Sequence, residues 1–181
     1  MASFFPSLRK EGAQLKDIQA PFAEIYKLWG RFSQALMRGP GPLSVAEREL
    51  IATYTSGVNA CSYCYHDHTM AAEHFGIEPA VFESLMDDVE SAPVDEKMKP
   101  LLRYVGKLTA SPSKLVQADA DAVFEAGWSE SELHFAILVS ARFSCINRLV
   151  QGHGIEHTTA IGDSWKTEQG LEYSILELDG A

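Results

Sequence analysis

The sequence predicts an all-α fold, a compact helical domain. Apolar residues recur at helical spacing along most of the 181 residues. Two capping boxes, Ser44-Val-Ala-Glu47 and Ser129-Glu-Ser-Glu132, each signal the start of a helix. No convincing series of strands could complete a sheet. The length suits one domain over residues 1–181, with a core at about 20–160 and a tail or arm at 161–181.

The first half of the chain divides at its proline and glycine residues. Apolar residues at helical spacing predict a helix from Pro21 to Met37, which Arg38-Gly-Pro-Gly-Pro42 ends. The capping box at Ser44 opens a second helix that runs towards Gly57. A third helix should start near Asn59 or Cys61 and stop near Gly76.

The second half predicts shorter helices followed by a long one. Pro79 stands at a first-turn position, and Asp95 to Leu108 is amphipathic, with Pro100 tolerated only near its start. A short helix from Ala118 to Glu125 ends at Gly127, and the second capping box follows. A last long helix passes through Ile146 to Val150, weakened by two later glycines, Gly152 and Gly154. The segment from Leu171 to Leu178 is a strand or a loose arm.

A shift of 85 residues lays one capping box on the other and His68 on His153. The fold is therefore a duplicated helical hairpin if the echo is real, with the chemistry in one copy. The alternative is that any two amphipathic helix pairs look alike.

Composition and charge exclude several classes of protein. The chain is 46% hydrophobic and 22% charged, as in soluble globular proteins, and no uncharged apolar run approaches 18 residues. Its first ten residues lack the apolar region of a secretory signal. The net charge of −10 argues against nucleic acids and anionic membranes as partners. Three cysteines, two of them in C-x-x-C, fit a reducing cytoplasm, where such a pair is catalytic or binds metal.

The most informative segment is Cys61-Ser-Tyr-Cys64-Tyr-His-Asp-His68. On a helix, Cys64 lies about 60° from Cys61 and His68 about 20° from it, whereas His66 points about 140° away. The start of a helix favours the thiolate, which is the reactive form of cysteine. An imidazole on the same face can accept a proton from a thiol or stabilise the thiolate.

Glu49 is the candidate carboxylate to complete this proton relay. It lies on the preceding helix, on a strip whose other members are small enough to let a second helix approach: Val45, Ala52, Thr53 and Ser56. A glutamate at a packed interface is costly unless it is paired or functional. Taken alone, however, Glu49 would be a solvated charge on a helix face.

Other interpretations of these residues stay open. A thioredoxin-like site requires Ile51 to Ser56 to be a strand. A zinc site requires a fourth ligand from Glu49 or His66. His66 and His74 are expected at the surface and Cys145 in the core, while His153 and His157 could bind a metal as a pair.

The motif Glu49-x11-Cys61-x-x-Cys64-x3-His68 resembles the signature of alkylhydroperoxidase D-like proteins in the carboxymuconolactone decarboxylase superfamily, and most of all the branch of peroxidase-related enzymes. The resemblance covers roughly residues 20 to 155. Further segments that resemble this branch are Pro42-Leu-Ser-Val-Ala-Glu-Arg-Glu-Leu-Ile51, His74-Phe-Gly-Ile-Glu-Pro79, Ser91-Ala-Pro-Val-Asp95 and Ile146-Asn-Arg-Leu149.

The resemblance implies an all-helical, obligate homo-oligomer, often a trimer or hexamer, that reduces hydroperoxides with thiols. By analogy Cys64 is the peroxidatic residue, Cys61 resolves its sulfenic acid to a disulfide, and Glu49 with His68 carries protons. Electrons would return from a dithiol donor, which in the best-known members is a lipoylated protein. No cofactor or metal is implied.

One position departs from the pattern. Members of the family often carry a histidine between the cysteines, where this chain has Tyr63, which is no base near neutral pH. The relay would then be simpler or the activity weaker. Decarboxylase activity is disfavoured, since those members generally lack C-x-x-C; a disulfide reductant or redox sensor, a zinc-binding helical module and an oligomerisation protein without chemistry remain alternatives.

Overall fold

The computed structural model describes residues 3–9 and 13–156, and every regular element within these ranges is helical. The all-α prediction is therefore confirmed. The elements are η1 (Pro6–Leu8), α1 (Leu15–Gln19), η2 (Ala20–Phe22), α2 (Ala23–Arg38), α3 (Val45–Val58), α4 (Ser62–His74), α5 (Ala80–Ser84), α6 (Met98–Ala110), η3 (Pro112–Lys114), α7 (Gln117–Glu125) and α8 (Glu130–Gly152).

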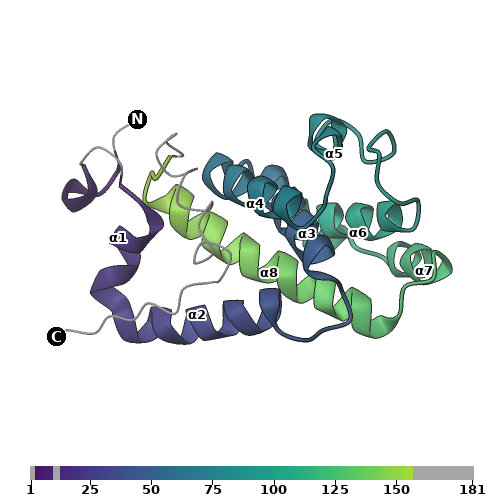
Figure 1. The fold of residues 1–181 in the computed structure, drawn as a ribbon, viewed down its shortest axis with the longest axis horizontal. Helices are drawn as coiled ribbons and strands as arrows, with labels where there is room; N and C mark the ends of the chain where they lie inside the picture. Colours follow the sequence, from purple (N-terminus) through teal and green to yellow (C-terminus); the bar gives the residue numbers. More distant parts are fainter. Residues whose placement is uncertain (1–2, 10–12, 157–181) are drawn as a thin grey trace.

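The long helix α8 runs through the middle of the molecule, with α2 along one side and α3, α4 and α6 on the other (Figure 1). Helix α3 is the most enclosed, because it packs against α4, α6 and α8, and every residue from Arg48 to Ser56 is buried. Apolar side chains from these helices form the core, among them Leu50, Ile51, Leu101, Leu102 and Phe143.

Both capping boxes form as predicted. The hydroxyl groups of Ser44 and Ser129 accept from the backbone N–H groups of Glu47 and Glu132, whose carboxylates accept in return from the serine backbone. Helix α2 begins after Pro21, which lies in η2. Helix α6 begins at Met98 instead of Asp95, because the Asp95 carboxylate accepts from the backbone N–H of Lys97 in a turn; Pro100 then lies in the first turn, where it is tolerated.

The second copy of the expected duplicated hairpin is a single helix, α8. The shift of 85 residues maps α3 and the start of α4 onto one unbroken helix, since nothing near Ser144 turns the chain as Ala60 does between α3 and α4. The segment at 171–178 lies outside the described residues. Of the described helices, α8 alone has the length and composition of a membrane span, and half of its most apolar window is buried inside the fold.

The turn from α3 to α4 brings Cys61 to its place. The backbone N–H of Cys61 donates to the carbonyl of Ser56 (2.9 Å) and that of Ala60 to Gly57 (2.8 Å), which is a Schellman motif. Ala60 takes the left-handed position of this motif, with φ of 53°, where glycine is usual. Asn59 and Ala60 thus end α3, and Cys61 becomes the N-cap of α4.

The Ala60→Gly variant should be more stable than the wild type by about 0.5–1 kcal/mol, because the left-handed conformation costs an L-residue about 1–2 kcal/mol and glycine loses about 0.5–1 kcal/mol in chain entropy. Urea unfolding measures this difference. Ala141→Gly, at an exposed position inside α8, is the matched control and should cost about 1 kcal/mol. An equal loss in both variants would contradict the strain at Ala60.

Candidate active site

The two cysteines lie together at the start of α4. Cys61 is its N-cap and Cys64 lies in its first turn, where unpaired backbone N–H groups favour negative charge. Both are free and buried, with 2% and 4% of their surface exposed, and their side chains are within hydrogen-bonding distance of each other. A dithiol in contact can close to a disulfide with little movement of the backbone.

The contact gives the two thiols different pKa values. The hydrogen bond that Cys64 donates lowers the pKa of Cys61, although burial opposes it. The same bond, together with burial, raises the pKa of Cys64 well above its ordinary value. The first negative charge on the pair therefore rests mainly on Cys61, and Cys64 needs a base to ionise.

Glu49 and His68 are brought together as the sequence predicts. Oε2 of Glu49 lies 2.7 Å from Nδ1 of His68, and both side chains are almost fully enclosed. Because α3 and α4 pack side by side, the small residues around Glu49 let the imidazole reach it. Cys64 precedes His68 by four residues on α4, so their side chains are neighbours on one face.

The electrostatics give the two members of this pair different charges. Burial acts to raise the pKa of Glu49, but the charges and hydrogen bonds of His68 and Arg38 hold it below its usual range. Burial lowers the pKa of His68, although the charge and the hydrogen bond of Glu49 act to raise it. At neutral pH Glu49 is thus a carboxylate, and His68 is a neutral imidazole that donates from Nδ1 and keeps Nε2 as its basic nitrogen.

Two arginines were not anticipated from the sequence. Nη1 of Arg38, the last residue of α2, donates to Oε1 of Glu49 at 2.6 Å. Arg142 on α8 donates from Nε to the hydroxyl of Ser33 (3.2 Å), and its positive charge lowers the pKa of His68. The next residue, Phe143, meets the His68 ring edge-on at 4.3 Å between centroids. Helices α2, α3, α4 and α8 therefore all contribute to the site.

Two further buried polar residues adjoin the thiols. The carboxylate of Asp67 raises the pKa of both cysteines. The side chain of Asn147 on α8 hydrogen-bonds both and lowers the pKa of both. Asn147 belongs to a segment that the resemblance already covers, and the signal that could have singled it out is an amide on the apolar stripe of α8 between Phe143 and Val150.

The remaining residues of interest lie apart from the dithiol. His66 and His74 are exposed, as expected. Cys145 is exposed, so its expected place in the core is wrong: it lies two residues after Phe143 and points to the other side of α8. His153 is half-buried with Nδ1 2.7 Å from the carbonyl oxygen of Leu149, and His157 lies outside the described residues.

Three further expectations concern the same region. Tyr63 is buried, and this burial, with the charge of Asp67, raises its pKa, so it cannot replace a histidine as a base. The strand required by a thioredoxin-like site is absent, since Ile51 to Ser56 lie in α3. Across residues 3–9 and 13–156, no three side chains of histidine, cysteine, aspartate or glutamate are grouped to hold a metal ion.

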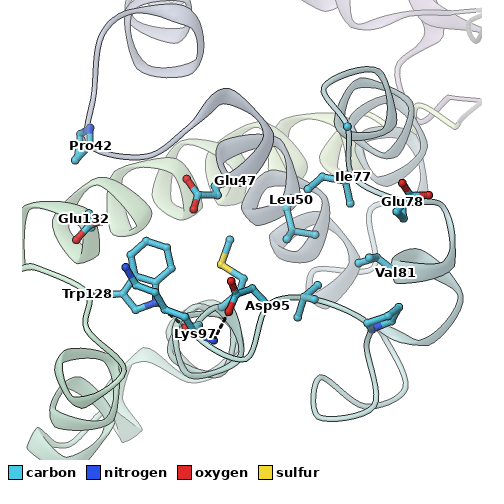
Figure 2. Close-up of a pocket in the computed structure, with 14 residues that line it drawn as sticks. Pro42, Glu47, Leu50, Ile77, Glu78, Val81, Asp95, Lys97, Trp128 and Glu132 are labelled. Carbon is cyan, nitrogen blue, oxygen red and sulfur yellow. Dashed lines mark hydrogen bonds between the residues drawn. The ribbon is translucent and has the colours of Figure 1, made fainter.

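A cavity of about 350 Å³ opens on a different face of α3 (Figure 2). Glu47 and Leu50 line it, whereas Glu49 between them points to His68. On the far wall the Lys97 ammonium lies 4.0 Å from the centroid of the Trp128 ring, whose Nε1 donates to the Lys97 carbonyl. None of the dithiol residues lines this cavity.

Comparison with known proteins agrees with the sequence signature. Residues 23–104 match the model of the carboxymuconolactone decarboxylase family. An uncharacterized peroxidase-related protein from Silicibacter sp. TM1040 aligns with a TM-score of 0.70 and 24% identity over 77% of this chain and 73% of its own. No curated protein matches this chain.

Two more solved structures share the fold. An uncharacterized peroxidase-related protein with an alkylhydroperoxidase AhpD core, from Ralstonia eutropha JMP134, has a TM-score of 0.71 and 20% identity over 90% of this chain and 95% of its own. A protein of unknown function from Agrobacterium tumefaciens has a TM-score of 0.66 and 18% identity over 79% and 97%. The expected alkylhydroperoxidase D-like fold is confirmed.

The buried pair predicts how stability depends on pH. Because the pKa of His68 is lowered on folding, the unfolded chain binds more protons below the ordinary value of 6.5, and stability falls as pH falls through that range. Glu49, with its pKa lowered from 4.5, adds a second loss at lower pH. Urea unfolding between pH 4 and pH 8 should show both losses.

His68→Gln should abolish the first loss and reduce the second, because it also removes one of the two groups that lower the pKa of Glu49. His74→Gln, at an exposed position on the same helix, is the matched control and should retain the wild-type profile. An identical pH profile for His68→Gln and the wild type would contradict a neutral buried imidazole.

Proposed function

We propose that the Cys61–Cys64 pair of this chain, whose residues 23–104 match the model of the carboxymuconolactone decarboxylase family, reduces hydroperoxides at the expense of a dithiol donor. The observation that carries this proposal is the contact of two thiols at the start of α4, one turn before an imidazole bonded to a buried carboxylate. The chemistry serves antioxidant defence.

The first step oxidises Cys64. Its sulfur attacks the outer oxygen of the hydroperoxide, so an S–O bond forms, the O–O bond breaks and the sulfenic acid of Cys64 results. The thiol proton passes to Nε2 of His68 and from there to the departing alkoxide, which leaves as an alcohol. Glu49 holds Nδ1 of His68 and stabilises the imidazolium between the two transfers.

The second step closes the disulfide. The sulfur of Cys61 attacks the sulfur of Cys64, an S–S bond forms, the S–O bond breaks and the hydroxyl leaves as water with the Cys61 proton. The donor dithiol then reduces the disulfide by exchange and is itself oxidised to a disulfide. One turnover converts a hydroperoxide and two donor thiols to an alcohol, water and a disulfide.

The electrostatics support Cys64 as the residue that needs the relay. Its pKa is raised, so it does not ionise unaided, and a thiolate from a less acidic thiol is the stronger nucleophile. The basic nitrogen for that proton belongs to His68, one turn further along the same helix. The pKa of Cys61 is lowered, so Cys61 gives up its proton more readily than Cys64 does, which suits it to attack the sulfenic acid.

The burial of both sulfurs restricts the donor. With 2% and 4% of their surface exposed, the cysteines are out of reach of a thiol fixed on the face of a folded protein. A small dithiol on a long flexible arm, such as a lipoyl group carried by a protein, fits this access best. A reducing cytoplasm is the compartment in which such a donor stays reduced.

Mixing the reduced protein with one equivalent of cumene hydroperoxide should consume two thiols per chain and form the Cys61–Cys64 disulfide, measured by thiol titration and mass spectrometry. Cys61→Ser should stop at a Cys64 sulfenic acid that dimedone traps, and Cys64→Ser should give no adduct. Cys145→Ser, at the exposed third cysteine, is the matched control and should behave as the wild type.

The outcomes separate the candidate functions. An adduct in Cys64→Ser would assign the peroxidatic role to Cys61. Thiols that form a disulfide with oxidised donor but not with peroxide would identify a disulfide reductant or sensor. Thiols that react with neither would indicate a structural protein and end the proposal.

Helix α2 supports the expected homo-oligomer. Three apolar side chains on one of its faces are exposed, as is that of the N-cap residue before it, by 43–67%: Ile25, Leu28 and Phe32, and the N-cap Phe22. They recur at intervals of three or four residues, so they form a continuous stripe, and monomeric proteins rarely leave such a stripe in water. A second copy of this chain, with the same stripe, is the partner that we propose.

Leu28→Glu should shift the protein from an oligomer towards the 19.9 kDa monomer, because a charge replaces the most exposed apolar side chain of the stripe. Light scattering coupled to size exclusion measures the mass. Val116→Glu, an equivalent change at another exposed apolar position, should leave the mass unchanged. A wild-type protein that is already monomeric would refute the α2 interface.

A further inference from the structure

Helix α8 presents three polar side chains to the turn between α3 and α4. Ser144, Asn147 and Gln151 are spaced by three and four residues, so they share one face of the helix. The amide of Asn59 donates to the hydroxyl of Ser144 (3.3 Å) and to Oδ1 of Asn147 (3.0 Å), and Gln151 donates to the backbone carbonyl of Asn59 (2.9 Å). The cysteine-bearing turn is thereby fastened to α8.

These bonds orient the Asn147 amide. Its oxygen is taken by the N–H of Asn59, so its nitrogen faces the other way, where it donates to the hydroxyl of Ser56 at 3.1 Å. The second N–H on that side of the amide is available to the two thiols, and Asn147 lowers the pKa of both. Asn147 is fully buried, and α3, α4 and the turn between them supply its partners.

We propose that Asn147 is a catalytic residue of the dithiol site, whose amide N–H holds the negatively charged sulfur in place for attack; this inference rests on the function proposed above. A neutral amide in a buried site keeps its donor at every pH, whereas His68 loses its basic nitrogen when it is protonated. The thiolate is thus held by one group and its proton is moved by another.

The other charged groups around the thiols include both carboxylates and guanidinium groups. Asp67 on α4 raises the pKa of both sulfurs, and Glu49 on α3 is neutralised by Arg38 from α2. Arg142 on α8 is bonded to Ser33 and lies against the Phe143 ring. Asn147 is therefore the uncharged donor that lowers the pKa of the two thiols, which Asp67 raises.

The test is the rate of thiol alkylation by iodoacetamide between pH 5 and pH 10, in a Cys145→Ser background and without peroxide. Asn147→Asp removes both N–H donors at nearly constant volume and should raise the midpoint of the pH profile by about one unit, which lowers the rate at pH 7 about tenfold. The plateau at high pH should stay near that of the parent, because the ionised thiol is equally reactive. Asn147→Ser, which adds no charge, should also raise the midpoint.

Ser140→Ala is the matched control: it removes a buried polar group from the same helix, bonded to Thr109 and remote from the thiols, and should leave the midpoint unchanged. Unfolding in urea identifies any variant that fails to fold. Unchanged midpoints in the folded Asn147 variants would overturn the role of Asn147. Because no peroxide is used, a raised midpoint supports it even if cumene hydroperoxide proves not to be a substrate.

Discussion

The site depends on one fully buried carboxylate, that of Glu49. An ionised glutamate without partners inside a protein costs several kcal/mol, so its place in α3 requires Arg38 on one oxygen and His68 on the other. These two bonds hold α2 and α4 at fixed positions against α3. The same bonds fix the tautomer of His68 and direct its basic nitrogen away from Glu49. The fold and the proposed proton transfer therefore rely on the same side chain.

The second constraint is the turn between α3 and α4. The Schellman motif requires a left-handed backbone conformation at Ala60. Because this motif ends α3 at once, Cys61 can cap α4 directly after it. A longer connection would leave the cysteines free to move relative to α8. The polar face of α8 then holds the turn at Asn59, so that the thiols, the imidazole and the carboxylate are all fixed by neighbouring helices.

The sequence predicts the parts of the site whose residues are close together along the chain, and it does not predict contacts between distant helices. The common face of Cys61, Cys64 and His68 follows from helical periodicity, and the capping box at Ser44 fixes the helix that carries Glu49. Arg38, Arg142 and Asn147 come from α2 and α8, and no local pattern states which of their faces meets α4. Cys145 shows the same limit, because its apolar neighbours in sequence lie on other faces of α8.

The charges around the dithiol explain why a histidine, and not solvent, should take the proton. Near the thiols the guanidinium groups of Arg38 and Arg142 balance the carboxylates of Glu49 and Asp67, while His68 is neutral. Loss of a thiol proton to water would leave an uncompensated negative charge in a buried region, which a low dielectric penalises. Transfer of that proton to His68 keeps the sum of charges at zero and creates an adjacent imidazolium. In the proposed reaction the proton then remains available for the alkoxide that leaves when the O–O bond breaks.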